Sequence, residues 1–143
     1  MRIVISACLL GLKTRYDGRA KPVELPAEFA DAEIIPFCPE VAAGLGVPRE
    51  PMTLADGGRV VRICDRTDMT ECLEKACAEF LAWLEAEDKP VDLFVLKSRS
   101  PSCGIAAPVR DANGAETGKA AGIWAAIVRK RFPDTPIKDE TQI

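Results

Sequence analysis

Three short, mostly apolar runs recur along the chain, and a cysteine follows shortly after each of them. The runs cover residues 2–6, 32–36 and 91–96, and the cysteines that follow are Cys8, Cys38 and Cys103. Runs with so few polar positions are typical of strands buried on both faces, as in parallel sheets. Ligands of open α/β sheets bind at the carboxyl ends of the strands. If the three strands are parallel neighbours, the three thiols therefore meet at one edge of the sheet.

The segments between these runs predict helices and hairpins. Apolar residues at three-four spacing from Thr67 to about Asp88 predict an amphipathic helix, with Thr67 or Asp68 as its cap. The turn residues Asp56-Gly57-Gly58 predict a hairpin over 52–63. The other predicted elements are a helix over 21–31, a brief helix from Pro39, a hairpin or flap over 105–114, a helix over 119–131 and a short strand in the tail. Strands alternating with helices predict an α/β fold with an open sheet.

Length and charge limit the class of protein. At 143 residues the chain has the size of one domain, and we expect residues 1–143 to form a single unit. A formal net charge of -3 gives no overall basic field, so polymeric nucleic acid is not an expected partner. The first residues contain too few apolar positions for a signal peptide or a membrane span. We therefore expect a cytoplasmic protein that does not bind membranes.

Six cysteines and the absence of histidine narrow the chemistry. Without an export signal, cysteines serve as thiols, core residues or metal ligands more often than as disulfides. The absence of histidine excludes Cys-His and Ser-His nucleophilic pairs and every zinc site that needs imidazole. Any chemistry must use thiolates, carboxylates, hydroxyls, Lys, Arg, Tyr or a cofactor.

Three of the cysteines are predicted to lie outside a site. The apolar stripe of the long helix consists of Met69, Cys72, Leu73, Ala76, Cys77, Phe80, Leu81, Trp83 and Leu84. Cys72 and Cys77 are therefore expected to pack as small core residues, and their five-residue offset places them poorly for a redox pair. Cys64 follows the first hairpin, and no strand end directs it toward the other thiols.

The thiols that follow the strands leave several interpretations open. Three thiolates could hold zinc with an open fourth position, or three irons of a four-iron four-sulfur cluster with the fourth iron free for a substrate. A dithiol redox pair and inert cysteines are the other interpretations. Cys38 precedes Pro39 at a predicted helix start, where free amides and the helix dipole would lower its pKa and favour the ligating thiolate.

Five segments of the chain resemble the signature blocks of a known family. They are Ser6-Ala7-Cys8-Leu9-Leu10-Gly11, Arg15-Tyr16-Asp17-Gly18, Cys38-Pro39-Glu40-Val41, Gly44-Leu45-Gly46-Val47-Pro48-Arg49 and Leu96-Lys97-Ser98-Arg99-Ser100-Pro101-Ser102-Cys103-Gly104. The family is that of the thiouracil desulfidases, small bacterial iron-sulfur proteins formerly listed as a domain of unknown function. The resemblance implies a Rossmann-like α/β fold, with a mostly parallel open sheet in three layers.

The resemblance also implies a cofactor and a reaction. The cofactor is a 4Fe-4S cluster held by Cys8, Cys38 and Cys103, with one iron left open. The reaction is the non-redox removal of sulfur, as sulfide, from a thiolated pyrimidine of the thiouracil type, either a free base or a nucleotide. This small molecule is the expected partner. A non-catalytic protein that binds or carries sulfide on the same cysteines is the alternative.

Residues near the three cysteines are candidates for the remaining roles. Glu40 lies two residues from a cluster ligand and is our candidate for positioning or deprotonating the attacking water; alternatively, it satisfies free amides at the helix start. Ser100 and Ser102 are candidates for donating hydrogen bonds to the cluster or to the pyrimidine ring, or else they cap the turn. Candidates for ring contacts or loop anchoring are Tyr16, Asp17, Arg49 and Lys97.

Overall fold

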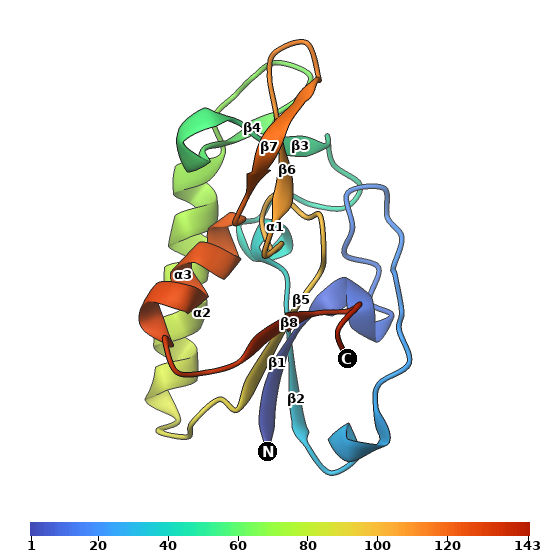
Figure 1. Ribbon diagram of the computed structural model, residues 1–143, viewed down its shortest axis with the longest axis vertical. Helices are drawn as coiled ribbons and strands as arrows, with labels where there is room; N and C mark the ends of the chain where they lie inside the picture. Colours follow the sequence, from blue (N-terminus) through green and yellow to red (C-terminus); the bar gives the residue numbers. More distant parts are fainter.

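A four-stranded parallel sheet, sheet A, forms the centre of the fold (Figure 1). The computed structural model describes residues 1–143, and sheet A has the strand order β2-β1-β5-β8. Its strands are β1 (Arg2–Ser6), β2 (Glu33–Phe37), β5 (Leu93–Leu96) and β8 (Ile137–Asp139). Every neighbouring pair is parallel. The prediction of three parallel neighbouring strands is confirmed, and the strand predicted in the tail adds to them as the fourth.

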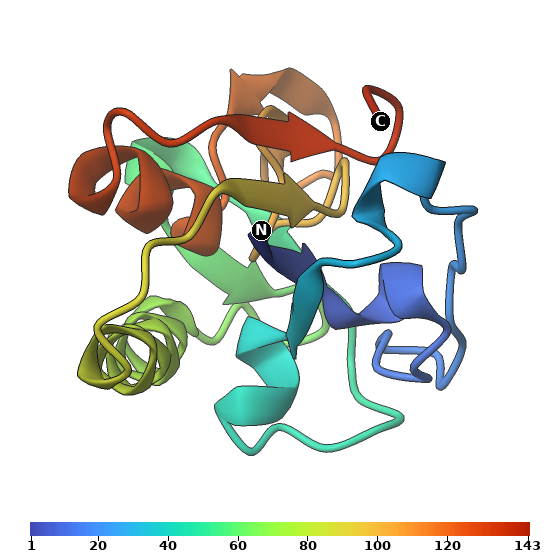
Figure 2. The same ribbon diagram turned by 90° about the horizontal axis from the view of Figure 1, so that it is seen from below.

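Both faces of sheet A are covered, which explains why the interior of β1, Ile3 to Ile5, and the whole of β5 are apolar. The side chains of Val4 and Phe94 belong to one core, which they share with α2 (Thr70–Ala86) and α3 (Ile123–Arg131). Those of Ile3 and Val95 belong to a second core, which includes Phe29. Figure 2 shows the two helices on one side of the strands and the 3-10 helices η1 (Ala7–Leu10) and η2 (Ala27–Phe29) on the other. The three-layer α/β arrangement is confirmed.

The two predicted hairpins combine into a second sheet, which the sequence did not predict. Sheet B has the order β4-β3-β6-β7. Its strands are β3 (Met52–Leu54), β4 (Val60–Arg62), β6 (Ala107–Arg110) and β7 (Glu116–Ala120). Each hairpin is antiparallel, and the pairing of Leu54 with Val109 joins β3 to β6 in parallel. Sheet B lies beyond the carboxyl ends of β1 and β5 (Figure 1), so it faces the edge where ligands are expected.

Helix α2 begins later than the cap preferences predicted. The residues just before it pair with β4 instead, since the Met69 N–H donates to the Val60 carbonyl at 2.8 Å. The helix therefore starts at Thr70, whose N–H donates to the Asp68 carboxylate at 2.9 Å. The predicted stripe packs on sheet A with one exception, because Trp83 is 51% exposed and stacks on Phe80 at the margin of the stripe.

Two other predicted helices differ from the structure, and one is confirmed. Only η2 is helical within 21–31, because the backbone there pairs with η1: the Lys21 N–H donates to the Cys8 carbonyl and the Val23 N–H to the Leu9 carbonyl. Helix α3 begins at Ile123 rather than near 119, since β7 continues to residue 120. Helix α1 (Pro39–Ala42) is confirmed. No helix combines the length and apolar character needed to cross a bilayer.

Candidate active site

A cavity of about 470 Å³ lies between the carboxyl edge of sheet A and sheet B. Its lining includes the three cysteines predicted to meet, Cys8, Cys38 and Cys103. The other predicted site residues also line it, except Asp17. The Asp17 carboxylate instead accepts a hydrogen bond from the Arg19 N–H at 3.0 Å, in an exposed turn. The structure therefore brings together nearly all of the candidate residues.

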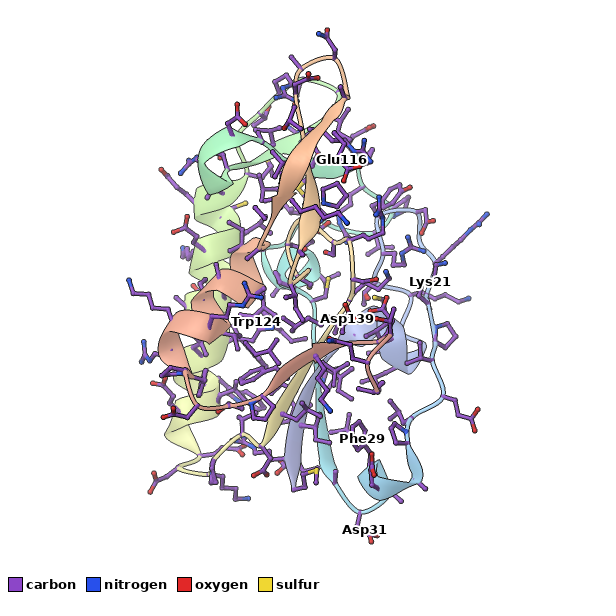
Figure 3. All side chains as sticks on the ribbon, in the orientation of Figure 1. Lys21, Phe29, Asp31, Glu116, Trp124 and Asp139 are labelled. Carbon is purple, nitrogen blue, oxygen red and sulfur yellow. The ribbon has the colours of Figure 1, made fainter.

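Aromatic packing fixes the strand end that carries Cys38. Phe37, directly before it, stacks on Phe80 of α2 with ring centroids 3.9 Å apart. Phe37 also meets Trp124 of α3 edge-on at 4.8 Å. Trp124 is fully buried between α3 and sheet A, where Figure 3 labels it. These ring contacts hold Phe37 between α2 and α3, so they position Cys38 at the end of β2, directly before the first turn of α1.

The loop that carries Cys103 is fastened to the start of α3. The Gly122 N–H donates to the Gly104 carbonyl and the Trp124 N–H donates to the Ser102 carbonyl, both at 2.8 Å. This contact requires glycine, because a Cβ added to Gly122 would lie 2.7 Å from the Pro101 carbonyl oxygen. Gly122 is therefore a packing residue that lets the cysteine loop and α3 approach each other.

Burial raises the pKa of all three cavity thiols. The pKa of Cys8 rises to about 11, with the neighbouring Cys38 as the next contribution, and that of Cys103 rises well above its ordinary value. Burial also raises the pKa of Cys38, although the backbone N–H groups of Val41 and Glu40 lower it. The predicted lowering of the Cys38 pKa is wrong, because desolvation exceeds the effect of the helix start. Such thiols become thiolates when a metal binds them.

The donor set of the cavity consists of three cysteine thiols, which suit zinc and iron alike. However, no three Cys, Asp, Glu or His side chains in the structure lie close enough together to share one metal ion. The three cysteines line a common cavity, and in an iron-sulfur cluster each of them would bind a different iron. These cysteines are therefore the residues that could hold a cluster.

A chain of hydrogen bonds fixes the Glu40 carboxylate beside the cysteines. Arg49 Nε donates to Glu40 Oε1 at 2.8 Å, and Ser102 Oγ donates to Oε2 at 2.6 Å. Ser100 Oγ lies 3.2 Å from Ser102 Oγ and accepts the Cys103 N–H at 3.1 Å. Because a serine has one proton and Ser102 gives its own to Glu40, Ser100 is the donor in the serine pair. The carboxylate is thus held through both oxygens, and the two serines connect it by hydrogen bonds to the loop that carries Cys103.

Arg49 is an anchor in this structure. Besides Glu40, its guanidinium donates through Nη1 to the Gly46 carbonyl at 2.9 Å and through Nη2 to the Thr14 carbonyl at 2.7 Å. Each of its nitrogens is therefore engaged within the protein. Of the two roles predicted for Arg49, this geometry supports loop anchoring over a contact with the pyrimidine ring.

The cavity is lined by more basic than acidic residues, although the chain has a net charge of -3. The basic lining residues are Arg15, Lys21, Arg49, Lys97 and Arg99, and the acidic one is Glu40. Arg49 pairs with Glu40, and Lys97 Nζ lies 3.1 Å from Glu140 Oε1. The side chains of Arg15, Lys21 and Arg99 form no ion pair. Three free cations therefore lie at the cavity, and Figure 3 labels Lys21.

Sequence reasoning missed five residues at the site, which are Ser6, Arg15, Lys21, Arg99 and Glu140. Ser6 Oγ accepts the Lys97 N–H at 2.9 Å. Burial and Cys38 raise the pKa of Cys103, while a hydrogen bond from the Ser6 hydroxyl lowers it. Glu140 reaches Lys97 from the tail, and Lys21 and Arg99 line the cavity. Ser6, Arg15 and Arg99 lie within the recognised segments, which is the signal that could have found them. Lys21 and Glu140 carry no such signal.

The fold and the cavity together define an α/β protein with a thiol-lined site at the carboxyl edge of a parallel sheet. More specifically, the chain belongs to the 2-thiouracil desulfurase family, which it matches over residues 3–140. It is 29% identical over 140 residues to the uncharacterized protein YbbK of Bacillus subtilis (strain 168), a match covering 90% of this chain and 89% of YbbK.

A solved structure supports the same assignment. The chain is similar to the 4Fe-4S-dependent thiouracil desulfidase TudS, with a TM-score of 0.80 and 32% sequence identity. The match covers 99% of this chain and 92% of TudS. The recognised family and the α/β fold are therefore both confirmed.

Proposed function

We propose that this protein removes sulfur from a thiolated pyrimidine of the thiouracil type, using a 4Fe-4S cluster held by Cys8, Cys38 and Cys103. The observation that carries the proposal is the single cavity that these cysteines share with the anchored Glu40 carboxylate. The carbon-sulfur double bond breaks and a carbon-oxygen double bond forms. The oxygen comes from water, whose two protons leave with the sulfur as hydrogen sulfide, so no electrons are exchanged.

The cluster and the protein divide the chemistry between them. When bound, the cluster would supply an iron without a protein ligand, whose Lewis acidity would polarise a thiocarbonyl group. Glu40 holds the attacking water and accepts its proton. Each of its oxygens accepts one hydrogen bond from the protein, and a carboxylate has further lone pairs for a water in the cavity. Ser102 and Arg49 keep it in one orientation.

The other candidates are assigned by their place around the cavity. Tyr16 and Lys97 line it and are proposed to contact the pyrimidine ring. Ser100 supports Ser102 and the backbone of Cys103, so its role is to orient the loop. Asp17 caps its own turn and is proposed to shape the segment that presents Tyr16.

The free cations favour a nucleotide over a free base as substrate. A pyrimidine base is uncharged near neutral pH, whereas a nucleotide carries a phosphate that arginine and lysine side chains bind well. Arg15, Lys21 and Arg99 have no carboxylate partner and line the cavity. We therefore propose that they bind the phosphate of a thiolated pyrimidine nucleotide.

The test is an assay of sulfide release by anaerobically prepared, cluster-loaded protein. Thiouracil and the monophosphate of the corresponding nucleoside are compared in water enriched in oxygen-18. Sulfide equal to the pyrimidine formed, with a single oxygen-18 atom in each product, is the expected result. Neutralising Arg15, Lys21 and Arg99 to Gln should raise the KM for the nucleotide and not that for the base. A loaded protein that releases sulfide from neither compound would contradict the proposal.

A further inference from the structure

The tail of the chain ends beside the cavity because of the register of β8. This strand pairs with β5 so that Asp139 lies opposite Leu96. The residues that follow these two, Glu140 and Lys97, are therefore neighbours at the carboxyl edge of sheet A. Figure 3 labels Asp139 at this end of β8. The turn after β8 is tied to itself, since the Asp139 N–H donates to the Gln142 side chain at 2.9 Å.

The Glu140 carboxylate binds the start of the cysteine loop through both oxygens. Oε2 accepts the Ser98 N–H at 2.8 Å, and Oε1 accepts the Ser98 hydroxyl at 2.5 Å. Oε1 also lies 3.1 Å from Lys97 Nζ, and both side chains of this ion pair are less than a fifth exposed. Burial raises the pKa of Glu140, but the hydrogen bonds from Ser98 outweigh it, so the carboxylate stays charged at neutral pH.

The Lys97 ammonium has three polar contacts within the protein, of which one is long. An ammonium group has three N–H bonds. One is directed at the Ser98 carbonyl, 2.7 Å away, and one at Glu140. The third contact, with the Ser98 hydroxyl oxygen, is 3.4 Å long. Because Lys97 lines the cavity, this N–H is the one that a group bound there can take over. The pair with Glu140 therefore decides where this donor points.

The residue after Ser98 is in a strained conformation that needs such support. Arg99 has a φ of 65°, in the left-handed region that residues with a Cβ rarely adopt. It is held from both sides: Ser98 binds Glu140, and the Ser100 carbonyl accepts the Gly104 N–H at 2.7 Å. Strained backbone that persists because its neighbours fix it is typical of functional sites.

We infer that Glu140 is a positioning residue of the active site: it aims the Lys97 ammonium into the cavity and holds the strained turn at Arg99. This inference rests on the proposed function for its effect on the reaction. Lys97 then stabilises negative charge that develops on the ring as water attacks, so loss of the Glu140 charge lowers kcat more than it changes KM.

The experiment compares Glu140→Gln with Lys97→Met and with the double variant. Glu140→Gln should keep the iron content of the wild-type protein and lower kcat by about tenfold or more, the range for a hydrogen bond to a charged group. If Glu140 acts through Lys97, the double variant is no slower than Lys97→Met alone. Asp134→Asn is the matched control, since it removes a charge from an exposed, unpaired carboxylate of the same tail and should behave as wild type. Additive effects, or a wild-type kcat in Glu140→Gln, would overturn the inference.

A second readout does not depend on catalysis. Trypsin cleaves after Lys97 and Arg99 only when this turn opens, so Glu140→Gln should be cut there faster than the wild type and Asp134→Asn. Equal cleavage rates would show that Glu140 does not hold the turn. If the loaded wild-type protein desulfidates nothing, the proposed function is wrong, and the cleavage rates still decide this part of the inference.

Discussion

The Ser102 hydroxyl donates a hydrogen bond of 2.6 Å to the Glu40 carboxylate, which connects two segments 62 residues apart. Ser102 is almost fully buried and directly precedes Cys103. The residue proposed to activate water is therefore fixed to the same loop that carries one of the three thiols. This link would hold the proposed water site at a fixed position relative to Cys103.

Removing the charge of Glu40 should abolish turnover and preserve the cluster. Glu40→Gln keeps the size of the side chain and can still accept one hydrogen bond, but it cannot take a proton from water. We expect the iron content of the wild type and a loss of desulfidation of about a hundredfold or more, typical of a lost general base. A sulfide carrier would need no such base, so intact turnover in this variant would remove Glu40 from the mechanism.

Ser102→Ala should have a smaller effect of the same kind. The variant leaves Glu40 charged but frees one of its oxygens, so we expect kcat to fall by about tenfold to a hundredfold, as for hydrogen bonds to charged groups. Kinetics with cluster-loaded protein measures this. An effect confined to KM would place Ser102 in substrate binding instead.

Arg49→Lys should not preserve function, although it preserves the charge. Lysine has one nitrogen and cannot reach Glu40, the Gly46 carbonyl and the Thr14 carbonyl at once. We expect a lower melting temperature and a lower kcat together, because the variant frees both the loop and the carboxylate. Arg66→Lys is a matched control, since the side chain of Arg66 is exposed and has no polar partner. A fully active Arg49→Lys variant would show that the three separate hydrogen bonds of the guanidinium group are not needed.

Gly122→Ala should disturb the cysteine loop through a single methyl group. The new Cβ would lie 2.7 Å from the Pro101 carbonyl oxygen and 3.0 Å from the carbonyl carbon of Ser102, both of them backbone atoms that can move only with the loop. The expected cost is about 1 to 3 kcal/mol, measured by denaturant unfolding, with reduced iron content. Gly118→Ala is the control, because nothing lies within 4 Å of its added Cβ. Equal stability of the two variants would contradict this packing.

The Asp68 carboxylate at the start of α2 should make the stability of the protein fall as the pH is lowered into the acid range. Hydrogen bonds from Thr70, and then from Arg59, lower the pKa of Asp68 from 3.8 to about 2. A carboxyl whose pKa is lowered on folding stabilises the protein fully above its ordinary pKa, and this contribution is lost as the pH falls toward the folded value. Asp68→Asn should therefore unfold at a lower temperature than the wild type at neutral pH. The difference should shrink between pH 3.8 and about 2, and a constant difference would contradict the assignment.

Local pattern was sufficient to predict the elements that carry the site. The apolar runs that became β1, β2 and β5 are short and continuous, and the carboxyl ends of parallel strands meet whatever the loops do. Cys8, Cys38 and Cys103 could therefore be placed at one edge without any coordinates. The hairpin over 52–63 and the body of the long helix also follow from turn chemistry and three-four spacing, although the helix begins at Thr70, later than predicted.

What the sequence could not predict depends on contacts between distant segments. Sheet B exists because Leu54 pairs with Val109, and no local pattern specifies that pairing. Glu140 reaches Lys97 only because β8 adds beside β5 in one register. The raised pKa of Cys38 likewise follows from burial by the assembled fold, which outweighs the local effect of the helix start. Local sequence thus determines the helices and strands. The charge pairs and pKa values of the site depend on how the tail and the two sheets pack together.

The central claim is that three cysteines hold a four-iron cluster in this cavity, and anaerobic iron and acid-labile sulfide analysis tests it most directly. The wild-type protein should contain about four irons and about four sulfides per chain. The triple variant Cys8→Ala, Cys38→Ala and Cys103→Ala should lose both. The matched triple variant of Cys64, Cys72 and Cys77, which lie outside the cavity, should keep them. Zinc in place of iron, or clusters that survive loss of the cavity cysteines, would contradict the account.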